Sequence, residues 1–141
     1  MGKEIIMKSI IESIIGRKGA KGMTRVPDLR EHDIVITGEP RIYIVLKDPE
    51  EIFQGLLNPK NKDMRQGILY CTNSSGSINW IPLIRYTETL EYENAFYNIN
   101  VVYRGNYKWD PKHTRDICLD SNLFELIRDR KYNLIWERKP L

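Results

Sequence analysis

The 141-residue sequence lacks most of the features by which a catalytic or metal-binding protein is recognised. It has two cysteines, Cys71 and Cys118, and two histidines, His32 and His113. None of these four residues belongs to a closely spaced pair of the kind found in zinc sites, so we expect no metal and no cofactor. A Walker A sequence, a nucleophile elbow and a catalytic-triad signature are also missing, which leaves nucleotide hydrolysis and acyl transfer without support.

Long apolar runs are missing as well. No run approaches the roughly 20 residues that a transmembrane helix needs, and no secretory signal is present. Both cysteines lie in mostly apolar stretches, so we expect reduced thiols and a cytoplasmic protein. Alanine occurs only at Ala20 and Ala95, whereas Ile and Asn are frequent. This bias is typical of an AT-rich genome and suggests a low-GC bacterium or one of its phages, in which case the protein acts in the host cytoplasm.

What is present suits one globular domain over residues 1–141. Hydrophobic residues make up 41% of the chain, and a chain of this length can bury about two-thirds of its unfolded surface without disulfides or metals. The net charge is only +3, but the charges are segregated, with a basic block at 16–30 and an acidic block at 31–58. The two blocks can neutralise each other in the fold, or the basic block can face a polyanion.

The N-terminal part of the chain predicts a helix followed by a loop. Residues 1–15 have the periodicity of an amphipathic helix, and its Ile-rich face is wide enough to cross a sheet or to meet a partner or a second subunit. Glycines then open a basic Gly-rich loop over residues 16–30.

Residues 33–137 predict a sheet with inserted helices. Alternating or β-branched runs predict strands at 33–37, 41–47, 68–72, 78–92 with a break near Pro82, 97–103 and 133–137. Helix signals predict insertions from Asp48 to about Leu57 and from Ser121 to about Lys131. We therefore expect an α+β fold with a mainly antiparallel twisted sheet and about three helices, and the pattern also allows a partly closed barrel.

Two basic segments are candidate binding sites for nucleic acid or another polyanion. Backbone amides and cations of the Gly-rich loop can neutralise phosphates, and the residues concerned are Arg17, Lys18, Lys21 and Arg25. A second segment combines cations with rings that can stack on unpaired bases, namely Arg104, Tyr107, Lys108, Trp109, Lys112 and Arg115. The alternatives are a solvated loop that pairs with the acidic block and aromatic side chains that simply fill the core.

One short stretch could carry catalysis. In Lys112-His113-Thr114-Arg115-Asp116, a nuclease could use His113 as general acid or base, Arg115 or Lys112 to stabilise the phosphate and Asp116 to orient a neighbour. Metal-independent RNA cleavage usually needs two proton-transfer groups, however, and His32 lies in a different segment. The alternative is an ordinary surface turn.

The leading hypothesis is a non-enzymatic binding or assembly protein, phage-encoded on its composition, that engages a polyanion such as nucleic acid. A viral structural protein or host-protein inhibitor that acts through the Ile-rich helix, as an oligomer or on a host partner, is the first alternative. A small metal-independent nuclease centred on His113 is the second.

Overall fold

The computed structural model describes residues 25–53 and 64–140 of the chain. Within these ranges the strands are β1 (Ile34–Thr37), β2 (Ile42–Leu46), β3 (Ile68–Thr72), β4 (Ile78–Pro82), β5 (Ile99–Gly105) and β6 (Tyr132–Glu137). The helices are α2 (Pro49–Phe53), α3 (Thr114–Ile117) and α4 (Asp120–Arg128), with short 3₁₀ turns η2 (Leu83–Arg85), η3 (Ala95–Tyr97) and η4 (Pro111–His113). The predicted helix at 1–15 and most of the predicted basic loop lie outside the described residues.

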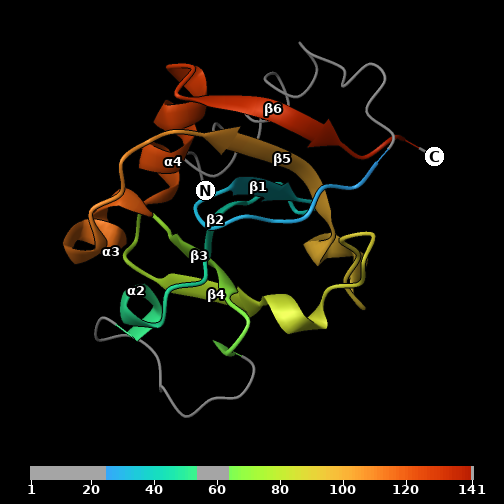
Figure 1. The fold of residues 1–141 in the computed structure, drawn as a ribbon, viewed down its shortest axis with the longest axis horizontal. Helices are drawn as coiled ribbons and strands as arrows, with labels where there is room; N and C mark the ends of the chain where they lie inside the picture. Colours follow the sequence, from blue (N-terminus) through green and yellow to red (C-terminus); the bar gives the residue numbers. More distant parts are fainter. Residues whose placement is uncertain (1–24, 54–63, 141) are drawn as a thin grey trace.

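The six strands form one sheet in the order β4-β3-β2-β1-β5-β6, and each neighbouring pair is antiparallel. The predicted α+β class and antiparallel sheet are therefore confirmed. The sheet is open, with β4 and β6 at its edges, so the partly closed barrel that the sequence allowed does not form. Figure 1 shows α2, α3 and α4 on one side of the molecule, and the segment that carries η2 and η3 on the other.

Both faces of the sheet are covered, which explains why every residue of β1, β2 and β3 is buried. On one face, isoleucines such as Ile36 and Ile44 pack against Leu123 and Ile127 of α4. The opposite face buries residues such as Val35 and Val45 under Val26, Leu29 and side chains from the 83–97 segment. A strand that is half-exposed alternates polar and apolar residues in its sequence. A strand that is covered on both faces instead has a continuous apolar sequence, here rich in Ile and Val.

A bulge in β5 changes which side chains share a face. Ile36 pairs with Val101, but the next residue of β1, Thr37, pairs with Ile99, so the register shifts at Asn100. Ile99 then packs on the face opposite to Val101. The simple alternation over 97–103 that the sequence suggested is wrong at this point, because an extra residue moves the side chains before it to the other face.

The helix starts follow local capping chemistry to different degrees. The carboxylate of Asp48 accepts the backbone N–H of Glu50 at 2.9 Å, which confirms the predicted start of α2. The predicted end of this helix near Leu57 lies outside the described residues. Helix α4 begins one residue earlier than predicted, after Leu119, and no side chain caps it. In the described parts of the chain, no helix has the length and apolarity that crossing a membrane requires.

The end of α4 is a left-handed turn. Arg130 has φ 59°, its N–H donates to the carbonyl of Ile127, and that of Lys131 donates to Leu126. These two bonds are the Schellman arrangement, in which glycine usually occupies the position of Arg130. The turn directs the chain into β6, whose first residue, Tyr132, pairs with Gly105 of β5.

Candidate functional site

The structure describes one of the two basic segments in full and only the end of the other. Arg17, Lys18 and Lys21 lie outside the described residues, so their role in binding a polyanion stays a prediction. Arg25 is exposed. The second segment is described in full and runs from β5 through η4 into α3.

Arg104 binds protein groups. Its Nε and Nη2 atoms donate to the two carboxylate oxygens of Asp33 at 2.9 and 2.8 Å, and Nη2 also donates to the carbonyl of Asp28 at 2.8 Å. Asp33 is 1% exposed, and the hydrogen bond to its carboxylate raises the pKa of Arg104. A bidentate pair of this kind fixes the 28–33 segment against β5.

Tyr107 and Trp109 are half-buried and pack edge-on, with ring centroids 6.1 Å apart. Both contact the core face that α4 covers. The ammonium group of Lys131 lies 5.7 Å from the centre of the Tyr107 ring, within the range of a cation–π interaction. Part of each ring therefore belongs to the core and part faces solvent.

The pairing of β5 with β6 brings further cations, which the sequence did not point to, near Tyr107 and Trp109. Since Gly105 pairs with Tyr132, the chain before β6 runs beside the chain after β5. The approach is so close that a Cβ atom at Gly105 would collide with the carbonyl oxygen of Lys131. Lys131 thus lies over the Tyr107 ring although it is distant in sequence, and the other exposed cations are near the two rings or Lys131 along the chain. We call this set the aromatic-basic surface: Tyr107, Lys108, Trp109, Lys112, Arg115, Arg130 and Lys131.

Beside this surface, His32 stacks on Trp109. Their ring centroids are 4.7 Å apart and the ring planes differ by 26°. The indole Nε1 of Trp109 donates to the hydroxyl of Thr114 at 3.2 Å, and that hydroxyl donates to the carbonyl of Pro111 at 2.9 Å. The indole is therefore held in place on one side by η4 and α3, and it fixes the plane of the imidazole on the other.

His32 also meets a buried carboxylate. Its Nε2 atom lies 2.9 and 3.1 Å from the two carboxylate oxygens of Glu51, and Glu51 is only 3% exposed. His32 has φ 67°, a conformation that few residues other than glycine adopt, and its backbone N–H donates to the carbonyl of Val45 at 2.7 Å. The surrounding structure thus holds His32 in a strained conformation with its ring against Glu51 and Trp109.

A third ligand-type side chain is near this pair. One oxygen of Glu31, which is exposed, lies within 4.8 Å of the ligand atoms of His32 and Glu51. Sequence reasoning missed this group because Glu51 is 19 positions from His32. The available signal was the helix start after Asp48, which places acidic residues shortly after the end of β2.

The predicted catalytic group is less closely assembled. His113 has a side chain that is 64% exposed, and its Nε2 atom lies 3.5 Å from the carboxylate of Asp110. The carboxylate of Asp110 also accepts the N–H of Lys112 and so caps η4. Both Arg115 and Asp116 are exposed on α3, and within the described ranges no hydrogen bond joins either side chain to His113. A catalytic role for His113, Arg115 and Asp116 stays a prediction.

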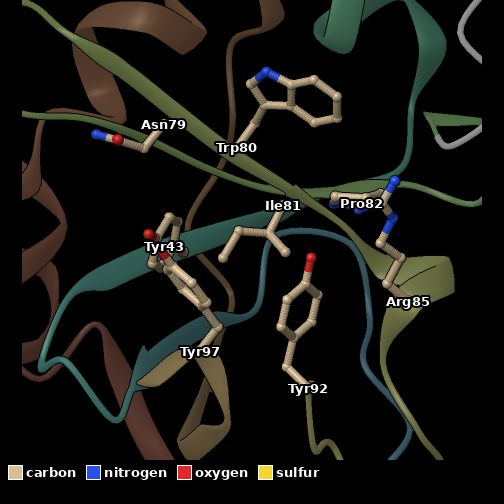
Figure 2. Close-up of a pocket in the computed structure, with 8 residues that line it drawn as sticks. All are labelled: Tyr43, Asn79, Trp80, Ile81, Pro82, Arg85, Tyr92 and Tyr97. Carbon is tan, nitrogen blue, oxygen red and sulfur yellow. The ribbon is translucent and has the colours of Figure 1, made fainter. Parts of the chain in front are cut away.

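The opposite side of the sheet carries a pocket of about 340 Å³. It is lined by Tyr43, Asn79, Trp80, Ile81, Pro82, Arg85, Tyr92 and Tyr97. Figure 2 shows Ile81, Tyr92 and Tyr97 turned toward one another, whereas the indole of Trp80 points away across β4. Arg85 is the one charged residue among these eight, so the pocket offers ring faces for packing rather than groups for acid–base chemistry.

Comparisons of the chain with protein-family models, with curated proteins and with solved structures found no match. What the protein binds must therefore be inferred from the site itself.

Proposed function

We propose that the protein binds single-stranded nucleic acid through the aromatic-basic surface. The observation that carries this proposal is the meeting of two half-exposed rings with exposed cations from two segments that the β5–β6 pairing brings together. Rings give each unpaired base a face to stack on, and the cations neutralise the phosphates between bases. This combination fits an unpaired strand better than a duplex, whose bases are already stacked.

The local charge also supports binding of nucleic acid. Apart from Arg104, whose charge Asp33 matches, residues 105–116 and 128–131 hold six basic and three acidic residues, an excess as large as the net charge of +3 on the whole chain. Positive charge is therefore concentrated at this end of the sheet. A local excess of this kind attracts a polyanion and makes its binding dependent on salt.

The test is a titration of a fluorescently labelled oligothymidylate followed by anisotropy at several salt concentrations. We expect binding that weakens as salt rises, and Lys131→Gln should weaken it and lower the salt slope by about 0.7, the value for one phosphate contact on a single strand. Tyr107→Leu keeps an apolar side chain against the core but removes the ring, and it should weaken binding roughly tenfold.

Lys139→Gln is the matched control, because Lys139 is also exposed but follows the other end of β6. It should leave affinity and salt slope close to those of the unmodified protein. No binding at low ionic strength, or equal losses in Lys139→Gln and Lys131→Gln, would overturn the proposal. A preference for duplex over single strands would overturn the role assigned to the rings.

A further inference from the structure

We propose that Glu31, His32 and Glu51 form a binding site for a divalent transition-metal ion of the zinc type. The site adjoins the aromatic-basic surface at Trp109 but shares no ligand residue with it, and it does not depend on nucleic-acid binding. It also departs from the sequence-based expectation of no metal, which rested on the missing short spacings between cysteines and histidines.

The spacing of the ligand atoms suits such an ion. One imidazole nitrogen and one oxygen from each carboxylate all lie within 4.8 Å of one another. Zinc bonds to nitrogen and oxygen are about 2.0–2.2 Å long, so ligand atoms around one ion are roughly 3–4 Å apart. Glu51 and His32 already meet this distance, and Glu31 is exposed, so a rotation of its side chain can close the remaining gap.

The burial of Glu51 is the independent observation that points to a cation. Its carboxylate is almost fully removed from water, yet within the described ranges His32 is the only group that donates a hydrogen bond to it. A buried carboxylate needs a positive charge or several donors to offset its lost hydration. The neighbouring buried acid, Asp33, has such partners in Arg104 and the N–H of Arg30. Among the described residues, Glu51 has only His32.

Charge and ligand type then select the ion. A metal ion at Nε2 displaces the proton that this nitrogen donates to Glu51, so the imidazole binds as the neutral tautomer with its proton on Nδ1. Two carboxylates and this neutral imidazole carry two negative charges, which a divalent ion balances. An imidazole ligand favours zinc, cobalt or similar ions over magnesium and calcium, which prefer oxygen ligands alone. Three protein ligands leave coordination positions open, and the exposed Glu31 side provides the path by which an ion and its waters reach the buried side chains.

The surrounding residues hold the histidine ring in one orientation. Trp109 stacks on the imidazole, and the hydrogen bond from Trp109 to Thr114 fixes the indole. Such support limits the reorganisation that metal binding would otherwise require. Trp109 is a positioning residue here, since it offers no ligand atom.

The experiment is a titration of the whole protein with Co²⁺, followed by visible absorption, and then displacement of Co²⁺ by Zn²⁺. We expect one ion per chain, competition by Zn²⁺ and no competition by Mg²⁺ at the same concentration. Because Trp109 lies against a ligand, bound Co²⁺ should also quench its fluorescence, and Trp109→Phe should remove most of that quenching.

Variants decide whether these three side chains are the ligands. Glu31→Gln changes an exposed residue, so the protein should fold normally, and Co²⁺ affinity should fall at least about tenfold. Glu51→Gln and His32→Gln should abolish binding, with folding checked by circular dichroism. Glu50→Gln, an exposed neighbour on α2, and His113→Asn, the other histidine, are the matched controls and should bind as the unmodified protein does.

Three results would overturn the site. The first is no Co²⁺ or Zn²⁺ binding by the unmodified protein. The second is affinity unchanged by Glu31→Gln. The third is an equal loss in His113→Asn, which would show adventitious binding at the other histidine.

Discussion

The guanidinium of Arg104 binds both carboxylate oxygens of Asp33, which lies 71 positions earlier in the chain. The same carboxylate accepts the backbone N–H of Arg30, and the guanidinium also reaches the carbonyl of Asp28. One arginine of β5 therefore fixes the short segment that leads to Glu31 and His32. Arg104, which the sequence suggested as a phosphate ligand, has protein partners for two of its nitrogens.

We expect Arg104→Lys to reduce stability without reducing nucleic-acid affinity. Lysine keeps the charge but loses the two-pronged geometry, so Asp33 stays buried with fewer hydrogen bonds. The free energy of unfolding, measured with urea, should fall by about 1–3 kcal/mol. Oligothymidylate affinity under native conditions should stay within about twofold of the unmodified protein. A loss of affinity comparable to that of Lys131→Gln, with unchanged stability, would instead assign Arg104 to phosphate binding.

The backbone of Arg130 has a left-handed conformation, and replacing this residue with glycine should raise stability, in contrast to Arg104→Lys. Its φ of 59° costs an L-residue energy that glycine avoids, so Arg130→Gly should stabilise the protein by about 1 kcal/mol in urea unfolding. The same change removes an exposed cation from the aromatic-basic surface and should weaken oligothymidylate binding. Arg130→Ala is the matched variant, because it removes the charge but keeps the Cβ atom. It should weaken binding equally and give no gain in stability, and a gain in Arg130→Ala would contradict the conformational explanation.

Both thiols should be unreactive in the folded protein. Cys71 and Cys118 are buried, and burial raises the pKa of Cys71 from 9.0 to about 12 and that of Cys118 well above its ordinary value. Since the thiolate is the reactive form, iodoacetamide at pH 8 should label neither thiol within the time that labels both in urea. Rapid labelling of native protein, read by mass spectrometry, would show that this part of the core opens readily.

Much of the sheet could be predicted because its signals are local. The Ile and Val of β1 and β2 favour strands, and the helix start at Asp48 follows from its carboxylate. Pro82 ends β4 because it cannot continue the hydrogen-bonded ladder, but the strand predicted between Pro82 and Tyr92 is wrong, since that stretch forms η2 and turns. Each of the confirmed signals depends on a residue and its immediate neighbours. The bulge at Asn100 could not be predicted in the same way, because it depends on how β5 meets β1 across the sheet.

The candidate sites depend on contacts between distant segments, and for this reason the sequence showed only part of them. Tyr107 and Trp109 were recognised by their spacing with lysines, but Lys131 joins them only through the β5–β6 register. His32 lies far from His113 in the sequence, so the sequence does not show that their segments are close. In the structure, α2 lies beside η4, so the segment that holds Glu51 and the segment that holds His113 are neighbours.

Alkaline pH should unfold the protein progressively from about pH 9. The pKa of Tyr103 is raised from 10.0 to about 12, mainly by burial, and burial also raises the pKa values of Cys71 and Tyr43. A group whose pKa is raised in the folded state stabilises it fully below its unfolded pKa. That contribution is lost as the pH rises toward the folded pKa, because the unfolded chain releases its proton first.

Tyr103→Phe measures how much the ionisation of the Tyr103 hydroxyl contributes to this loss of stability at high pH. Phenylalanine keeps the ring in the core but has no proton to release, so the loss of unfolding free energy between pH 9 and pH 11 should be about 1 kcal/mol smaller than in the unmodified protein. Urea unfolding at both pH values measures the difference. If Tyr103→Phe has the same pH dependence as the unmodified protein, the Tyr103 hydroxyl titrates alike in the folded and unfolded chains, and its burial does not protect it from ionisation.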